Sequence, residues 1–278
     1  MGNSTYKDGG EPRESTDRVE ANSNTPQHKL DILSKVKSRL RREQYLTSPL
    51  SIVTSPIYFI RNGLYRTIQG LAPRIEGDIL DFGCGSKPYE SLFTKAASYV
   101  GVDIEVSGHD HATSKIDVYY DGKHLPFVND RFDAVVAFEV LEHVFNIDEV
   151  ISEMRRVLKP GGHMLISIPF AWDEHEAPYD FSRYTSYGIK HIHERNGFET
   201  LEVKKTTTYV AAVCQMFLAY LSQHVSPKNR VLSKCFQISV IFPLNLAALS
   251  LNFILPRRYE YFCNSVVLAR KPIEASAS

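Results

Sequence analysis

The chain has 278 residues, of which 43% are hydrophobic and 23% are charged, so it is long enough to bury one substantial core. Lysine plus arginine (32) equals aspartate plus glutamate (32), which removes the composition argument for a nucleic-acid partner. The four cysteines show neither a metal-binding nor a disulfide spacing, and the polar N-terminus lacks the apolar segment of a signal peptide. We therefore expect a cytoplasmic protein that binds no nucleic acid.

The first 72 residues precede the predicted core. Residues 1–28 are rich in Ser, Asn, Gly, Glu and Pro and hold almost no large apolar side chains, which predicts a disordered tail. Residues 29–45 place an apolar residue at every fourth position among lysines and arginines, which predicts an amphipathic basic helix. Such a helix either packs on the domain or contacts a membrane surface or a polyanion. A second helix is expected over 56–71, so N-terminal helices span 29–72.

From residue 73 onward, short β-rich segments alternate with helical ones. The expected strands are residues 78–82, 98–104, 117–120, 132–138, 163–168, 198–205 and 264–270. The helix between the fourth and fifth strands spans 147–158 and begins at a capping-box-like pair, Asn146 and Glu149. The next helix spans 186–196. This pattern predicts a doubly wound, Rossmann-like α/β fold with a seven-stranded sheet, its core at 73–206 and its last strand and tail at 259–278.

A glycine turn, D-F-G-C-G at residues 81–85, directly follows the first strand. Its two glycines permit a tight turn and a close approach of the backbone to a ligand. Asp103, at the end of the second strand, lies where a carboxylate can accept hydrogen bonds from ribose hydroxyls. Pro88 stands where a dinucleotide fingerprint requires glycine. Because S-adenosylmethionine has no pyrophosphate to bind, this position favours it over NAD or a nucleotide-sugar.

Five motifs occur in order between residues 77 and 169: D-x-G-C-G, D-G-x-x-L-P-F, F-D-x-V, E-V-L-E-H-V and L-K-P-G-G. Their joint order resembles the ubiquinone- and menaquinone-biosynthesis type of class I S-adenosylmethionine-dependent methyltransferase. The resemblance implies methyltransferase activity with S-adenosyl-L-methionine as cofactor.

The resemblance also implies which residues hold the cofactor, through motifs that match residue by residue. They are Asp81, Gly83, Cys84, Gly85, Asp103, Ile104, Asp121, Gly122, Phe138 and Glu139. It assigns the glycine turn to the methionine portion, Asp103 to the ribose, and Asp121 with Gly122 to the adenine edge. Alternatively, aspartates at strand ends can simply cap their own loops.

Two clusters compete to supply the general base that an oxygen nucleophile needs. The first is Glu139, Glu142 and His143, whose i, i+3, i+4 spacing would place all three on one face of a helical turn. Such ligands could hold a divalent ion such as magnesium, and the motif resembles that of metal-dependent O-methyltransferases acting on polyprenyl-catechols and small-RNA 3′ ends. Whether a metal binds stays open, because Glu142 and His143 can also satisfy each other.

The second cluster lies in the loop after the fifth strand, residues 169–185, where open α/β sheets place their ligands. His175 is the preferred general base, with Asp180 and Arg183 orienting it or the substrate. An equally good interpretation is an ordered lid held by an Asp180–Arg183 pair. If a metal binds, His175 could be a distant extra ligand. Three rings could form an aromatic wall: Trp172, Phe181 and Tyr184.

About sixty residues separate the last two strands, which normally form a hairpin in this fold. Within them, 206–227 and 235–256 contain no Lys, Arg, Asp or Glu, although several polar residues make both stretches poor membrane spans. Since the flanking strands share one sheet, we expect a helical hairpin over 207–258. It would cover the substrate mouth, pair with another subunit in a homo-oligomer, or dip into a membrane face.

Together, these patterns predict an enzyme that methylates a small or lipid-linked acceptor, more readily at oxygen than at carbon or nitrogen. The alternative from another class is a catalytically silent S-adenosylmethionine-binding partner subunit. In that case the apolar insertion would be its interaction surface.

Overall fold

The computed structural model describes residues 51–105 and 114–273. The chain divides into two compact units, Met1–Leu40 and Arg41–Ser278, and every described residue belongs to the second. The predicted disordered tail (1–28) and basic helix (29–45) therefore lie outside the described residues.

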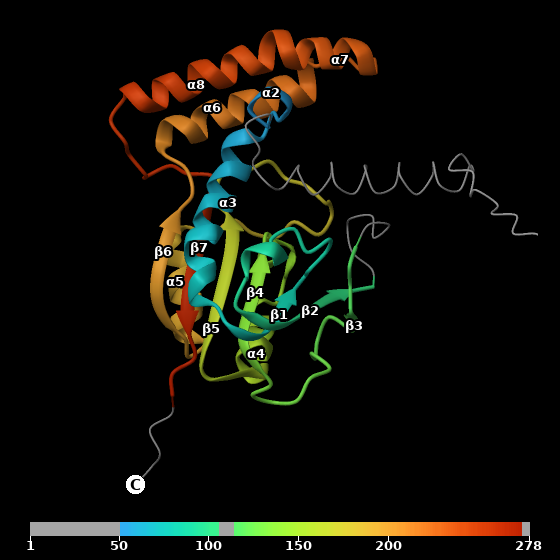
Figure 1. The fold of residues 1–278 in the computed structure, drawn as a ribbon, viewed down its shortest axis with the longest axis vertical. Helices are drawn as coiled ribbons and strands as arrows, with labels where there is room; N and C mark the ends of the chain where they lie inside the picture. The colour runs from blue at the N-terminus through green and yellow to red at the C-terminus, as the bar shows by residue number, and fades with distance from the viewer. Residues whose placement is uncertain (1–50, 106–113, 274–278) are drawn as a thin grey trace, which may run out of the picture. The chain divides into compact units, whose positions relative to one another are not determined.

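Seven strands form one sheet in the order β3-β2-β1-β4-β5-β7-β6, as Figure 1 shows. Their bounds are β1 Gly77–Phe82, β2 Ala96–Ile104, β3 Val118–Tyr120, β4 Phe132–Phe138, β5 Leu158–Pro169, β6 Glu199–Lys205 and β7 Asn264–Arg270. The first five strands pair in parallel, and β7 is antiparallel to both β5 and β6. The predicted seven-stranded, doubly wound α/β fold is confirmed, and the seven expected strands overlap those observed.

Helices cover both faces of the sheet. The helices are α2 Ser51–Thr54, α3 Tyr58–Leu71, α4 Ile147–Val157, α5 Ser186–Arg195, α6 Tyr209–Tyr220, α7 Arg230–Phe236 and α8 Phe242–Ile254. Short 3-10 and π segments are η1 Ala72–Arg74, η2 Glu90–Leu92, η4 Leu141–His143, η5 Leu221–Val225 and η6 Gln237–Ile241. Buried apolar residues of α4 and α5 pack on one face of the sheet, and those of α3 pack on the other.

The start of α4 differs from the prediction in one detail. The Asn146 side chain caps no backbone amide of the helix; its Nδ2 instead donates to Glu149 Oε2 over 3.0 Å. The expected capping box is therefore wrong. The apolar face of α4 is buried regardless, because packing on the sheet outweighs the contribution of one cap.

The segment between β6 and β7 is a helical hairpin, as predicted. It runs through α6 and η5, turns, and returns through α7, η6 and α8. Because β6 is antiparallel to β7 and β7 is antiparallel to β5, β6 ends at the same edge of the sheet as β4 and β5. Figure 1 shows α6 and α8 side by side beyond this carboxyl edge. The topology thus places the hairpin near the loops that carry the candidate site.

Candidate cofactor and catalytic site

The glycine turn after β1 has one packed side and one open side. The backbone amides of Gly83 and Cys84 donate to the Val102 carbonyl over 2.8 and 3.2 Å. Gly83 has a φ of +65°, and a Cβ built on it would lie 2.5 Å from Cγ1 of Val140. Gly85 has a φ of +46°, and a Cβ there would meet no heavy atom of the described residues within 4 Å. The space for a ligand therefore lies at Gly85, whereas Gly83 is needed for packing.

Asp103, at the end of β2, is held beside the open glycine. Its side chain is buried, with Oδ2 accepting from the Gly85 amide over 3.0 Å and Oδ1 accepting from the Ile104 amide over 2.9 Å. A carboxylate offers about four acceptor positions, so two amide bonds leave capacity for a ligand's hydroxyls. The structure brings Gly85, Asp103 and Ile104 together, and their contact with a cofactor stays a prediction.

Asp81 is buried under the turn, where its Oδ2 accepts from the Tyr99 hydroxyl over 2.8 Å. Burial raises the pKa of Asp81 to about 7, even though the Tyr99 hydrogen bond and Lys87 favour its charged form. Lys87 itself is buried, and its Nζ donates to the Tyr99 carbonyl over 3.3 Å and to Asp117. The sequence prediction missed this lysine, because its partner lies thirty residues away and the pair forms no local motif.

Asp121, expected at the adenine edge, caps its own turn. Its Oδ1 accepts from the amides of Lys123 and His124 over 2.8 and 2.9 Å, and these bonds lower its pKa. The loop-capping interpretation thus describes this side chain. Gly122 beside it has a φ of +81°, the left-handed conformation that such a turn requires. An adenine contact by either residue stays a prediction.

Phe138 and Glu139 end β4 and point to different neighbours. The Phe138 ring joins an aromatic cluster with Tyr89 and Phe93, its centroid 4.9 and 6.2 Å from theirs. Glu139 has a φ of +55° and accepts from Ser167 Oγ over 2.6 Å and from Asn264 Nδ2 over 2.5 Å. Burial raises the Glu139 pKa to about 7.

The expected helical face over 139–143 is wrong. Only Leu141–His143 forms a 3-10 turn, and Glu139 precedes it in the left-handed region, turned toward β5 and β7. Glu139 and Glu142 therefore do not project together from one helical face. With both carboxylate oxygens hydrogen-bonded to protein, Glu139 acts here as an anchor between strands.

Glu142, His143 and His175 form a polar cluster beside this turn. Glu142 is 0% exposed, and neither of its carboxylate oxygens has a hydrogen-bond partner among the residues that the structure describes. Burial raises its pKa well above the ordinary value. His143 Nε2 lies 3.8 Å from Glu142 Oε1, while its Nδ1 lies 2.8 Å from the Tyr179 carbonyl oxygen. The His175 ring meets the His143 ring edge-on, with centroids 4.8 Å apart. The structure brings together two histidines that are 32 positions apart.

These three side chains could hold a metal ion. One ligand atom from each of Glu142, His143 and His175 lies within 4.8 Å of the others. A fully buried carboxylate with no partner carries a large desolvation cost, which a cation would relieve. This donor set differs from the expected one, because Glu139 is hydrogen-bonded elsewhere and His175 lies beside His143.

An ion pair holds His175 in place. Asp180 binds Arg183 in a two-point geometry, with Oδ1 to Nη1 at 2.5 Å and Oδ2 to Nη2 at 2.6 Å, which lowers the Asp180 pKa to about 2. Asp180 Oδ2 also accepts from the His175 amide over 2.9 Å, and Arg183 Nη2 lies 3.4 Å from His175 Nδ1. The same pair therefore orders the loop and orients the histidine, so the two interpretations made from the sequence are compatible.

The predicted aromatic wall is not assembled as expected. Phe181 meets Phe145 at the surface with ring centroids 5.4 Å apart, whereas Tyr184 packs against the main core. Phe181 and Tyr184 are three positions apart, and a helix would place both rings on one face. The segment after β5 is an irregular loop, so the two rings have different packing partners.

Comparison with known proteins decides the family. The methyltransferase domain family matches residues 58–203, which is over half of the chain. The chain belongs to this methyltransferase family. The resemblance drawn from the ordered motifs is thereby confirmed, and the methyltransferase contains its glycine turn, Asp103 and the histidine cluster within the matched region.

Two curated relatives each align with part of this methyltransferase. A protein of Mycolicibacterium smegmatis, named a probable S-adenosylmethionine-dependent methyltransferase, is 31% identical over 147 residues, covering 51% of this chain and 55% of the relative. A ubiquinone/menaquinone biosynthesis C-methyltransferase of Burkholderia mallei is 32% identical over 136 residues, covering 42% and 56%. The chain spans about half the length of the curated relatives it matches. A solved methyltransferase of Archaeoglobus fulgidus aligns with 17% identity and a TM-score of 0.48, covering 84% of this chain and 99% of that one.

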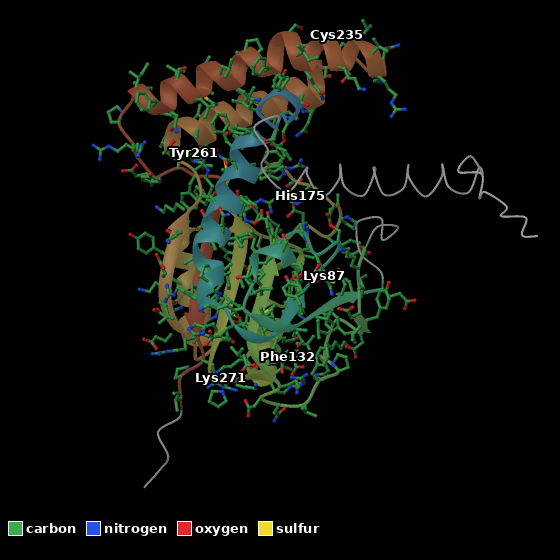
Figure 2. All side chains as sticks on the ribbon, in the orientation of Figure 1. Lys87, Phe132, His175, Cys235, Tyr261 and Lys271 are labelled. Atoms are coloured by element: carbon green, nitrogen blue, oxygen red, sulfur yellow. The ribbon has the colours of Figure 1, made fainter. Side chains whose placement is uncertain are left out.

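The family match ends before the helical hairpin, which nevertheless touches the site loop of this methyltransferase. Gln223 Nε2 in η5 donates to Asp173 Oδ2 over 3.1 Å, two residues before His175. In Figure 2, His175 lies on the hairpin side of the sheet, whereas Phe132 and Lys271 lie at the opposite end. The hairpin is therefore joined to the loop that carries the candidate catalytic histidine.

Proposed function

We propose that this protein transfers a methyl group from S-adenosyl-L-methionine to a hydroxyl of a small or lipid-linked acceptor. The observation that carries the proposal is the pairing of Asp103 with Gly85: a buried carboxylate fixed on the amide of a glycine whose side-chain space is open. The family and the names of the relatives support the same cofactor. We further propose a cytoplasmic location, which the four unpaired cysteines support.

The residues around the glycine turn fit such a cofactor. Asp103 would accept hydrogen bonds from the ribose hydroxyls, and Gly85 would let the backbone approach without a side chain in the way. Asp81 lies beneath the turn and has a raised pKa, so a positively charged ligand group nearby would favour its ionised form. When bound, the cofactor supplies an activated methyl group on a sulfonium; the chain must align the acceptor and exclude water.

An oxygen acceptor needs a base, and we propose His175 for this role. The Asp180–Arg183 pair fixes the loop and keeps His175 Nδ1 among polar neighbours. Its Nε2 has no hydrogen-bond partner within residues 51–105 and 114–273 and can accept the proton of an acceptor hydroxyl. His143, in edge contact with His175, completes the polar surface that the acceptor would meet.

We also propose that Glu142, His143 and His175 hold a divalent cation. The cation would supply polarisation of an acceptor oxygen. Two imidazoles and one carboxylate suit zinc or manganese better than magnesium, which prefers oxygen ligands. As a metal ligand, His175 could not also serve as the free base. The metal content of the purified full chain decides between the two roles. About one bound metal ion per wild-type chain, lost in Glu142→Gln, supports the cation. No bound metal after growth and dialysis with metal rules out the cation and leaves His175 free to act as the base.

The cofactor proposal is tested by calorimetry with S-adenosylhomocysteine on the full chain. We expect binding in wild type, a loss of at least about tenfold in Asp103→Ala, and no change in the matched surface variant Asp148→Ala. Wild type failing to bind, or Asp103→Ala binding equally well, contradicts the proposed site. Transfer of labelled methyl groups to lipid or small-molecule extracts, with the product identified by mass spectrometry, then tests activity. Binding without transfer to any fraction would favour the silent partner subunit.

A further inference from the structure

The helical hairpin carries an unusual distribution of charge. From Thr206 to Tyr259 there is no Asp or Glu, and five basic residues are present: Lys228, Arg230, Lys234, Arg257 and Arg258. All five are exposed, and in the described part of the chain none is in a salt bridge. Lys228 lies in the turn between the two arms, Arg230 and Lys234 lie in α7, and Arg257 and Arg258 follow α8, so positive charge stands at both ends of the long second arm.

Two polar side chains within the apolar stretches, one in each arm, point inward. Gln215 is 0% exposed and binds the Phe59 amide and the Pro56 carbonyl over 3.1 and 2.8 Å. Asn245 is likewise 0% exposed and donates to the Ile52 carbonyl over 2.8 Å. These side chains attach the inner face of the hairpin to the segment that contains α2 and the start of α3. Two of the polar residues that argued against a membrane span in the sequence, Gln215 and Asn245, are thus buried and hydrogen-bonded inside the fold.

The outer face is correspondingly apolar. The continuous helical segment Arg230–Ile254 is 25 residues long and is apolar enough to cross a membrane by length and composition. Large side chains along it are mostly in solvent: Leu232 is 57% exposed, Ile238 60%, Phe253 82% and Ile254 74%. In α6 on the other arm, Phe217 is 54% exposed. This is the reverse of a soluble helix, which turns its polar side outward.

We infer that this outer face binds the surface of a lipid bilayer that carries anionic headgroups. Large apolar side chains flanked by unpaired lysines and arginines are what a helix lying in the membrane interface requires. The clamps of Gln215 and Asn245 keep one side of the hairpin on the protein, which opposes a full crossing. A second copy fits less well, because twofold pairing sets a surface against itself and would face basic residues with basic residues.

The surface adjoins the candidate site. Both lie at the carboxyl edge of the sheet, and the Gln223–Asp173 hydrogen bond joins them. Figure 1 shows the arms of the hairpin beyond the ends of β4 and β5. Resting on the proposed function, this placement would let the site meet an acceptor whose lipid part stays in the bilayer. The membrane contact itself does not depend on that chemistry.

Vesicle co-flotation of the full chain tests the inference. We expect the chain to bind vesicles that contain phosphatidylcholine and the anionic lipid phosphatidylglycerol. Binding should be weaker at higher salt concentration, and weaker to vesicles of phosphatidylcholine alone. The double variant Ile238→Glu with Phe253→Glu should lose at least about tenfold in binding. The matched control is Val128→Glu, which changes a 72% exposed apolar residue far along the chain from the hairpin and should bind as wild type does.

Several results would overturn the inference. Wild type failing to float, or the double variant floating as well as wild type, removes the hairpin as the contact. A dimer by light scattering that the double variant dissociates, without vesicle binding, assigns the face to a second copy. S-adenosylhomocysteine binding and circular dichroism, measured on the same samples, show that each variant is folded and separate failure of this inference from failure of the proposed function.

Discussion

Replacing Asp81 by asparagine should stabilise the fold at neutral and higher pH. Asp81 is 3% exposed, and burial raises its pKa from 3.8 to about 7. The folded state therefore binds more protons than the unfolded state between these values, so stability falls as pH rises through that window. The difference corresponds to about 4 kcal/mol as an upper bound. Asparagine keeps the shape and can still accept from Tyr99, yet carries no charge.

Urea unfolding of the cofactor-free full chain between pH 4 and pH 8 measures this effect. The fluorescence of Trp172, which is the only tryptophan, and circular dichroism can both follow the transition. The variant and wild type should converge near pH 4 and diverge toward pH 8. Asp78→Asn is the matched control: Ser98 and Arg131 lower the Asp78 pKa, so its contribution is present above the unfolded pKa and is lost as pH falls. Parallel curves for wild type and Asp81→Asn would refute the reasoning.

Three further results are expected. Gly83→Ala should lower the free energy of unfolding by about 2–3 kcal/mol, because its methyl group meets Val140. Gly85→Ala should cost only about 1 kcal/mol of stability but should weaken the binding of S-adenosylhomocysteine. Thermal unfolding and calorimetry compare the two variants, and equal effects would contradict a turn that is packed at Gly83 and open at Gly85. Asp180→Asn should reduce methyl transfer at least about tenfold, because it releases His175. In the wild type, the ionised Asp180 contributes to the stability of the fold above its unfolded pKa, and this contribution should be lost as pH falls through about 2. Unchanged transfer in that variant argues against the orienting role. A metal chelator should lower the thermal unfolding temperature of wild type that has been loaded with metal, if Glu142, His143 and His175 bind the ion. An unchanged unfolding temperature would argue against a metal ion in this cluster.

The architecture could be predicted from the sequence because it depends on local signals. The expected strand 132–138 matches β4, and 264–270 matches β7. An alternation of short β-rich segments with an amphipathic helix such as α4 admits few topologies, since parallel strands need crossover helices. The turn at 81–85 and the carboxylate of Asp103 were also readable, because both follow strands directly and topology brings strand ends to one edge.

The site beyond the cofactor turn depended on contacts that no local pattern contains. The spacing of Glu139 and His143 indicated a shared helical face, but hydrogen bonds from Ser167 and Asn264 hold Glu139 in another direction. Likewise, His175 lies against His143 in a loop that the Asp180–Arg183 pair holds through the His175 amide. Side-chain direction at a strand end is set by partners on distant strands, so it is decided only when the sheet has formed.

Composition alone determined that 206–227 and 235–256 are apolar and free of charged side chains, and the shared sheet of the flanking strands predicted a helical hairpin over 207–258. Which side of those helices meets protein was decided by tertiary structure. Gln215 and Asn245 turn inward because a buried amide must find backbone partners, and Pro56 and Ile52 supply them. Beside these polar groups, apolar residues such as Leu218 and Ile241 are buried, whereas Phe253 and Ile254 are left outside. A one-dimensional pattern records how much apolar surface a segment has, whereas only packing decides which part of it remains exposed.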